Sequence, residues 1–271
     1  MIKLQTHRSD GDHYYSADGT PCYGVGIRTA RSEGLLPSPS TILGVMSKPG
    51  ITVWLQRQVA EAALDAAEQV KRQVEDRAEQ VGTIVDLARK RSEGAMTLGT
   101  NIHAIAERCL KPSSTGSEPD DEDLSALDVY KQPITDYVAA NVLRTRWCEQ
   151  TVSHIGPKIA FAGRVDALVE HQHYGLSVID WKSSKVPRRN GKPTPKWYDP
   201  YIIQLASYSY AIDGQPQPIS VAIDTSPGFE GGIHEKAWSE IEVERGWRMF
   251  NLLYRLWCEV KKYSPHEYYK A

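Results

Sequence analysis

Apolar and polar residues alternate with two periods along the chain, a helical one in the first half and a strand-like one after residue 141. Residues 13–30 alternate around Asp18-Gly19, which predicts a hairpin. Serine followed by proline at Ser38-Pro39 predicts the start of a helix. Small and aliphatic residues then recur every three or four positions from Leu55 to Val85. This spacing predicts one long amphipathic helix, or two shorter ones with a break near Gly82.

A further helix is expected to begin between Gly94 and Gly99, because the next apolar residues have the same helical spacing. These residues are Leu98, Ile102, Ile105 and Cys109. Residues 112–123 are rich in serine, proline, glycine and acidic residues and are expected to form a surface loop. A helix over about 124–143 should follow this loop.

The second half of the chain is expected to fold as a sheet with flanking helices. The strand pattern runs over 142–156, 158–170 and 176–183, with a tight turn at 171–175. A helix is expected over 199–212, strands over 219–224 and 232–237, and an amphipathic helix over 239–263. This order indicates an α/β fold. We expect a single domain over 1–271, with a hairpin and helical extension over 1–93 and the core over 94–271.

Composition narrows the class to globular proteins without membrane segments. The 271 residues carry 32 basic and 34 acidic side chains, and 41% of them are apolar, close to the average for folded domains. No apolar run reaches the roughly 18 residues of a membrane helix, and the N-terminus is too polar for a secretory signal. We therefore expect a cytoplasmic protein. Four widely spaced cysteines predict free thiols rather than disulfides or a cysteine-built zinc site.

Charge is segregated along the chain although the formal net charge is only −2. Residues 180–200 contain six basic and two acidic side chains, whereas residues 118–123 contain five acidic side chains in six positions. The small net charge argues against a protein that coats nucleic acid without specificity. A polyanion site would therefore depend on the basic segment or on a metal ion.

Two of the predicted strands carry charged residues suited to metal chemistry. Side chains at i and i+2 of a strand share a face, so Asp180 and Lys182 point the same way. The short turn lets Asp166 on the preceding strand approach Asp180. Two carboxylates and an ammonium group form a hard-oxygen site for Mg²⁺ or Mn²⁺, in which the lysine orients a metal-bound water. The alternative is a row of ordinary exposed charges.

Two helical segments each place two polar groups one turn apart. His103 and Glu107 share a helix face in the first half of the chain, and Gln204 and Tyr208 share one in the second half. Taken singly, these residues have simpler interpretations, as a histidine packed in the core and as polar residues on a helix surface.

Taken in order, the polar positions resemble one family. They form Gly-Thr-x-x-His at 99–103, Gly-x-x-Asp at 163–166, Asp-x-Lys at 180–182 and Gln-x-x-x-Tyr at 204–208. This order is similar to the RecB-like branch of the PD-(D/E)XK nucleases, a group that includes phage exonucleases and the mitochondrial genome maintenance exonuclease. Pro37–Leu43, with Trp54 after it, is similar to an N-terminal segment of the same group, so the resemblance covers about residues 37–260. It implies a restriction-endonuclease-like core with a central mixed sheet.

The resemblance also implies an activity, that of a metal-dependent DNA exonuclease. The ligands of Mg²⁺ or Mn²⁺ would be His103, Asp166, Asp180 and the carbonyl of Trp181, and Lys182 would be the catalytic lysine. A role in phage or prophage DNA recombination, in the host cytoplasm and beside a strand-annealing protein, is inferred from an architecture without a motor domain. Membranes are not expected as partners.

Further residues follow from the same comparison. Gln204 and Tyr208 would lie along the DNA path and hold the lysine or a phosphate. Glu107 is added here as a carboxylate that supports the metal site or binds a second ion, or else is an exposed helix glutamate. Cys258 is the one cysteine in the C-terminal part, so the iron–sulfur cluster of some relatives is not expected. No Gly-x-x-x-x-Gly-Lys-Ser/Thr loop occurs, so no nucleotide is expected.

A basic loop and a helix start are candidates for DNA contact. The loop offers Lys185, Arg188, Arg189 and Lys192 for phosphates and Trp197 for stacking on a base, unless it is simply a solvated charged loop. At the helix start, Ser38, Ser40 and Thr41 are suited to a phosphate, but plain capping explains them equally well.

Two other activities fit the same residues. The first is a structure-specific or flap endonuclease with the same catalytic centre, which would differ by cutting covalently closed circles. The second is a non-catalytic DNA-binding module on a nuclease fold, against which the intact set of Asp166, Asp180, Lys182 and Gln204 argues.

Overall fold

The computed structural model describes residues 12–46, 49–74, 76–111 and 127–269. They divide into two compact units, one with the described residues of 1–46 and 105–271 and the other with those of 47–104. The predicted loop over 112–123, with its acidic run at 118–123, lies outside the described residues. Within the described ranges, no helix combines the length and the apolar character that crossing a membrane requires.

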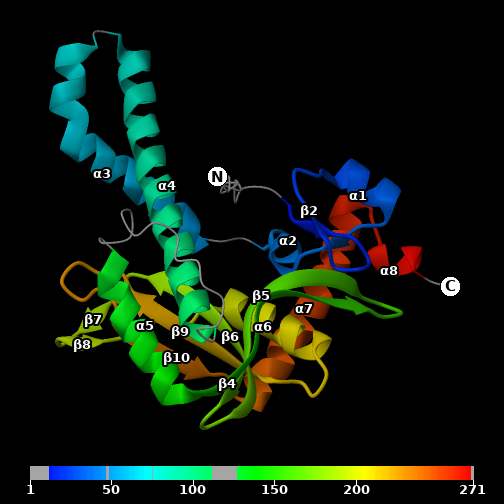
Figure 1. The fold of residues 1–271 in the computed structure, drawn as a ribbon. Helices are drawn as coiled ribbons and strands as arrows, with labels where there is room; N and C mark the ends of the chain where they lie inside the picture. Colours follow the sequence, from blue (N-terminus) through cyan, green and yellow to red (C-terminus); the bar gives the residue numbers. More distant parts are fainter. Residues whose placement is uncertain (1–11, 47–48, 75, 112–126, 270–271) are drawn as a thin grey trace, which may run out of the picture. The chain divides into compact units, whose positions relative to one another are not determined.

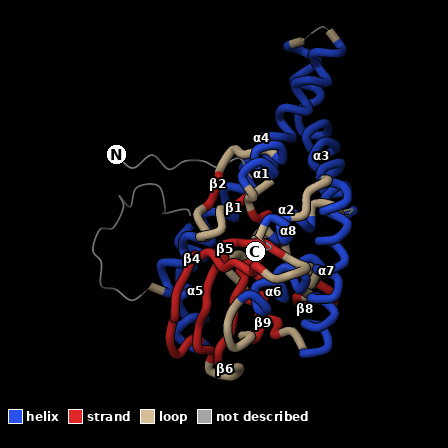
Figure 2. The backbone as a smooth tube through the Cα atoms, turned by 90° about the vertical axis from the view of Figure 1, so that its right-hand side faces the viewer, coloured by secondary structure: helices blue, strands red, loops and turns tan. Residues whose placement is uncertain are grey.

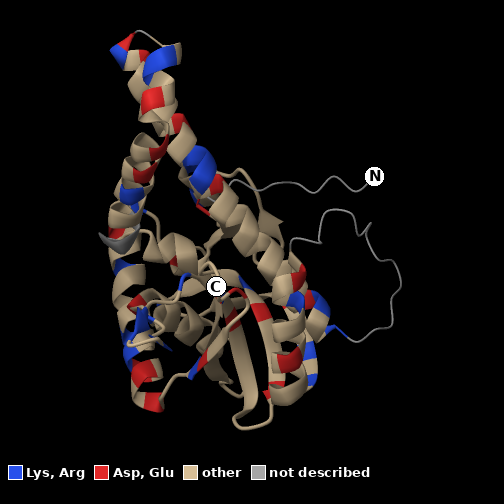
Figure 3. Cartoon of the chain, turned by 90° about the vertical axis from the view of Figure 1, so that its left-hand side faces the viewer, with Lys and Arg blue, Asp and Glu red and all other residues tan. Residues whose placement is uncertain are grey.

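The smaller unit is built from one long helix and most of a second, whose last residues belong to the larger unit (Figure 1). Helix α3 spans Pro49–Gln73 and helix α4 spans Arg77–Leu110. Arg91 on α4 pairs with Asp65 on α3 at 2.8 Å. The side chain of Asp76 accepts a hydrogen bond from the backbone N–H of Glu79 (2.9 Å) and so caps α4. Acidic and basic residues are mixed along both helices (Figure 3).

The helix boundaries predicted for this region are wrong. The break lies between Gln73 and Arg77 and not near Gly82. No new helix begins between Gly94 and Gly99, because α4 continues through all of these glycines. A glycine inside a helix costs only about 1 kcal/mol relative to alanine. The capping aspartate therefore marks the boundary better than the internal glycines do.

A five-stranded mixed sheet forms the centre of the larger unit (Figure 1). Its strands are β4 (Val142–Ile155), β5 (Ala160–His171), β6 (Gly175–Ser184), β9 (Gln217–Asp224) and β10 (Ile233–Ala237), in the order β10-β9-β6-β5-β4. β6 and β9 are parallel, and the other neighbours are antiparallel. The predicted α/β fold with a central mixed sheet is confirmed.

Helices cover both faces of this sheet (Figure 2). α5 (Asp128–Asn141) lies on one face, where Tyr137 packs edge-on against Trp181 with ring centroids 5.7 Å apart. α6 (Asp199–Ala211) and α7 (Glu240–Lys261) lie on the other face. Ser239 and Glu242 form a capping box at the start of α7. Because both faces are covered, β9 is buried along nearly all of its length and β6 through its middle.

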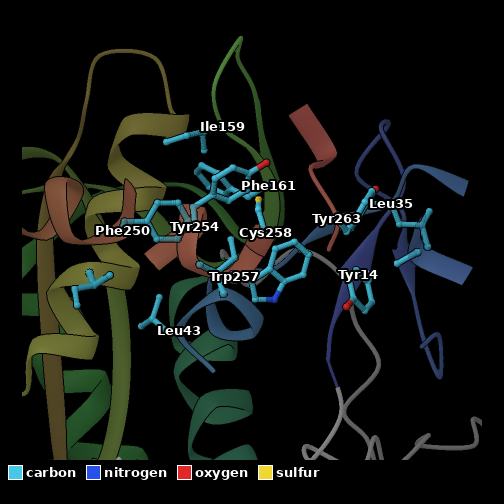
Figure 4. Close-up of a cluster of buried hydrophobic side chains, with 13 residues drawn as sticks. Tyr14, Leu35, Leu43, Ile159, Phe161, Phe250, Tyr254, Trp257, Cys258 and Tyr263 are labelled. Atoms are coloured by element: carbon cyan, nitrogen blue, oxygen red, sulfur yellow. The ribbon is translucent and has the colours of Figure 1, made fainter. Parts of the chain in front are cut away.

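The first described residues pack against α7. They form β1 (Tyr14–Tyr15), β2 (Pro21–Cys22) and β3 (Leu36–Pro37) in one small sheet, with helices α1 (Ile27–Glu33) and α2 (Pro39–Leu43). Pairing of Tyr14 with Cys22 confirms the predicted hairpin, whereas helix α1 was not expected. Tyr14 and Leu43 share a buried cluster with Phe161 of β5 and with Tyr254 and Trp257 of α7 (Figure 4). This segment therefore shares a core with the sheet, and α8 (Pro265–Tyr268) follows α7.

Candidate functional site

Asp166 and Asp180 lie where the pairing of β5 with β6 ends. The ladder runs as far as Ala167, which pairs with Ile179. One further step of the same register places Asp166 opposite Asp180. There the Asp166 carboxylate accepts a hydrogen bond from the backbone N–H of Trp181 (2.8 Å) and takes the place of a backbone acceptor. The structure thus brings together the two strands' carboxylates, as the sequence predicts.

Lys182 lies beside Asp180 on the same face of β6. Its Nζ is 2.8 Å from Oδ1 and 2.6 Å from Oδ2 of Asp180. Asp180 is buried, while 21% of the Lys182 side chain is exposed. Burial disfavours the charge of the lysine, but the nearby Asp180 and Asp166 carboxylates outweigh it and raise the pKa of Lys182 above its usual value. The lysine is therefore a cation, held at the edge of the site.

Glu149 on β4 is a third carboxylate that sequence reasoning did not identify. Its neighbours Cys148 and Gln150 pair with residues 167 and 165, so Glu149 stands opposite Asp166. Its φ of 53° is unusual for a residue other than glycine. Arg164 Nε lies 2.5 Å from its carboxylate, and its side chain is 18% exposed. Like charges directly across a sheet are destabilising, so a cation at this point would relieve the repulsion.

The donor atoms in this region fit a divalent metal ion. Within the larger unit, one carboxylate oxygen of Glu149 and one of Asp166 lie within 4.8 Å of each other. Carboxylate oxygens suit Mg²⁺ and Mn²⁺, and an imidazole nitrogen is accepted more readily by Mn²⁺. Asp166 is one of the predicted ligands, whereas His103 belongs to the smaller unit and remains a prediction. The other two remain predictions: Asp180 contacts Lys182, and Trp181 contacts Asp166 through its N–H.

One face of α6 lines the same region. Tyr201, Gln204 and Tyr208 recur at helical spacing, and Gln204 Nε2 donates a hydrogen bond to Tyr208 Oη (3.2 Å). Burial raises the pKa of Tyr208, so its hydroxyl is neutral. A Cβ on Gly163 would meet Tyr208 Cε1 at 2.9 Å, which shows how closely β5 approaches α6. Tyr208 therefore supports Gln204 from inside the core.

Tyr201 was not identified from the sequence. Lys182 Nζ lies 5.3 Å from its ring centroid, within the range of a cation–π contact. Its position three residues before Gln204, on the same helix face, is the feature of the sequence that could have identified it.

Glu107 makes an ordinary helix ion pair. Its carboxylate lies 2.6 Å from Lys111 Nζ, four residues on, and 26% of its side chain is exposed. Burial, followed by the Glu107 charge, raises the pKa of the Cys148 thiol to about 11. Glu107 thus lies near β4, and its role at the metal site remains a prediction.

The basic loop forms a small hairpin of β7 (Arg188–Arg189) and β8 (Lys192–Pro193). Asn190 and Gly191 have φ angles of 52° and 74°, the backbone that a type I′ turn requires. Lys185, Arg189 and Lys192 are exposed, and none of the three forms an ion pair with any part of the chain that the structure describes.

Arg188 has a different environment from the other basic residues of the loop. Its guanidinium lies 2.8 Å from the buried Asp224 carboxylate and 3.3 Å from the ring centroid of Phe229. Burial opposes the charge of Asp224, but hydrogen bonds from Ser226, Val186 and Arg188 outweigh it and lower the pKa of Asp224. Arg188 thus anchors the base of the hairpin to the end of β9.

The remaining candidates divide between the core and the surface. Ser38 caps α2 by accepting the Thr41 N–H (3.0 Å), and Thr41 contacts the backbone of His13, so both hydroxyls act inside the fold. Ser40 is exposed. Trp197 packs partly buried against a core cluster.

Comparison with known proteins identifies the class that this fold and site define. The family model of the PD-(D/E)XK nuclease superfamily matches residues 77–224, more than half of the chain, and the chain belongs to this superfamily. The match runs from α4 to β9 and includes Asp166, Asp180 and Lys182. Membership implies phosphodiester hydrolysis on nucleic acid, with a divalent metal as the usual cofactor. Among curated proteins, no match was found.

Proposed function

We propose that this chain is a Mg²⁺- or Mn²⁺-dependent deoxyribonuclease of the RecB-like kind, which digests DNA from an end. The observation that carries the proposal is the group at the end of β5 and β6. Asp166 contacts the Trp181 N–H at 2.8 Å, and Lys182 contacts Asp180 at 2.6 Å. Two carboxylates and a lysine, close together beside a third carboxylate, provide what phosphodiester hydrolysis requires.

The residues present fit the metal that the superfamily implies. Asp166 and Glu149 would hold it, with Asp180 adjacent, because a carboxylate oxygen of each lies within 4.8 Å of the other. His103 is proposed as a further ligand on the sequence resemblance alone. A bound divalent ion would make water more acidic and would neutralise charge on the scissile phosphate.

Lys182 and Gln204 are the protein side chains that would contact the substrate or the attacking water. The Lys182 ammonium group donates to Asp180, and 21% of the side chain is exposed; the proposal gives this group a contact with a phosphate oxygen or the attacking water. Gln204 is held by Tyr208, which leaves its carbonyl oxygen to orient the lysine or the substrate. The leaving 3′-oxygen takes up its proton from solvent, and the products carry 5′-phosphate and 3′-hydroxyl groups.

Exposed cations in the segment between β6 and α6 support DNA as the substrate. Arg189, Lys192 and Lys185 would contact backbone phosphates, while Arg188 holds the hairpin in place. Ser40 is a further candidate for a phosphate contact. The phage or prophage recombination role, and a strand-annealing partner, rest on the sequence resemblance alone.

The test is digestion of end-labelled linear DNA and covalently closed circular DNA with and without Mg²⁺. We expect metal-dependent release of nucleotides from linear DNA and no cutting of circles. Lys182→Gln and Asp180→Asn should each lower the rate at least about 100-fold while the protein stays folded. Lys236→Gln is the matched control, because Lys236 also pairs with a carboxylate at 2.7 Å and is 26% exposed.

Three outcomes contradict the proposal in different ways. Cutting of closed circles would indicate an endonuclease. Binding without cutting would indicate a non-catalytic module. Wild-type rates from Lys182→Gln would remove the lysine from the catalytic centre.

A further inference from the structure

An aromatic pair leads from Lys182 to the surface at the start of α6. Tyr201 lies 5.3 Å from Lys182 Nζ, measured to its ring centroid. The ring of Tyr198 lies 5.5 Å from that of Tyr201 and packs edge-on, at 84°. Tyr201 is partly buried against the core, whereas Tyr198 is 49% exposed. Lys182 therefore contacts Tyr201, and Tyr201 contacts Tyr198, whose ring is exposed to solvent.

The backbone before α6 determines which aromatic residue faces the solvent. Tyr198 occupies the N-cap position with φ −95° and ψ 145°, an extended conformation, and its side chain makes no capping bond. Consecutive side chains of an extended segment point to opposite sides. Trp197 therefore packs inward against the core cluster, and Tyr198 points outward. The sequence favoured Trp197 for base stacking, but its neighbour Tyr198 has the more exposed ring.

We propose that Tyr198 stacks on an unpaired nucleobase of the strand whose phosphate is bound at Lys182. This inference rests on the proposed nuclease function and names its substrate more narrowly, as single-stranded DNA or a frayed duplex end. Both faces of a base inside a duplex are covered by its neighbours, so a protein ring needs an unstacked base. Every base has a π-face, so the contact would not depend on sequence. The exposed Lys196 next to Trp197 adds a cation for the adjacent backbone.

Tyr174 provides a matched control. It is 44% exposed, similar to Tyr198, and stacks on His171 at the turn between β5 and β6. Gly175 beside it is five residues of strand from Asp180, about 17 Å away. Exposure alone therefore does not distinguish the two tyrosines, but the distance to the proposed site does.

The experiment measures DNA binding without cleavage in an Asp180→Asn background. The probe is a short single-stranded oligonucleotide with 2-aminopurine at one position, which is moved along the strand in a series. We expect fluorescence quenching at one position, and Tyr198→Ala should remove it and weaken binding roughly 10-fold. Tyr198→Trp and Tyr198→Phe should retain the quenching, because stacking requires the ring and not the hydroxyl. Tyr174→Ala should bind like the parent.

The outcomes separate this inference from the proposed function. If the protein with Asp180 intact cleaves DNA but Tyr198→Ala quenches and binds like its parent, only the stacking inference is overturned. The stacking inference also fails if Tyr198→Ala weakens the binding of fully paired, blunt DNA as strongly as that of single strands. A parent that binds no oligonucleotide, together with an intact protein that cleaves none, overturns both.

Discussion

Replacement of Gly163 by alanine tests whether β5 approaches α2 and α6 so closely that only a glycine fits at this position. A Cβ there would lie 2.7 Å from Pro39 Cδ and 2.9 Å from Tyr208 Cε1. Neither atom is the end of a flexible side chain, because Pro39 is a ring in the buried first turn of α2 and Tyr208 is 5% exposed. Such overpacking costs about 1–3 kcal/mol. For a chain of this size, we expect the melting temperature to fall by roughly 3–10 °C.

The same change should lower activity, because Tyr208 cannot move without disturbing its hydrogen bond to Gln204. Thermal unfolding and the cleavage rate are measured on the same samples. Gly94→Ala is the control, and it should change the stability in the opposite direction. Gly94 is inside α4 with nothing within 4 Å of a Cβ, so alanine should stabilise by about 0.5–1 kcal/mol. If Gly163→Ala melted with the wild type and cleaved at the wild-type rate, the close approach of β5 to α6 would be disproved.

Three further changes test separate parts of the site. Glu149→Gln should weaken Mn²⁺ binding. The stabilisation that Mn²⁺ gives in thermal unfolding should then fall by about 1.4 kcal/mol for each tenfold loss of affinity. An unchanged stabilisation by Mn²⁺ would exclude Glu149 as a ligand. Asp224→Asn should cost roughly 3 kcal/mol at pH 7, because the Arg188 charge loses its partner. Because the pKa of Asp224 is lowered, the loss is expected only at pH values above that pKa, where Asp224 is charged. Urea unfolding in acid should therefore show a smaller difference in free energy of unfolding between wild type and variant. A difference that does not change with pH would contradict the ion pair. The double change Arg189→Ala and Lys192→Ala should reduce the slope of log affinity for DNA against log salt concentration by about 1.5–2. An unchanged slope would show that the hairpin does not contact DNA.

The centre of the fold and part of the site could be predicted from local patterns. The strand period places Asp180 and Lys182 on one face, and a short turn fixes the neighbour of that strand. These two rules together bring Asp166 to Asp180 without knowledge of the rest of the chain. The helix period groups Gln204 with Tyr208 in the same way.

Other contacts depend on long-range pairing, which the sequence does not encode locally. Glu149 is opposite Asp166 only because β4 pairs in one particular register, with irregularities before residue 148. Arg188 looks like any loop arginine until Asp224, 36 residues later, ends β9 beside it. Trp197 and Tyr198 are adjacent aromatic residues, and the extended backbone before α6 decides which of the two rings is buried.

The charges at the site explain why metal and substrate would depend on each other. Glu149, Asp166 and Asp180 are three carboxylates, and they face two cations, Lys182 and Arg164. Their formal sum is one negative charge, which repels a phosphate. A divalent ion would change the sum to one positive charge, which attracts it. Loss of Glu149 is therefore expected to affect metal binding first, and DNA binding at the site through the metal. The exposed cations of the hairpin are instead proposed to act on DNA directly.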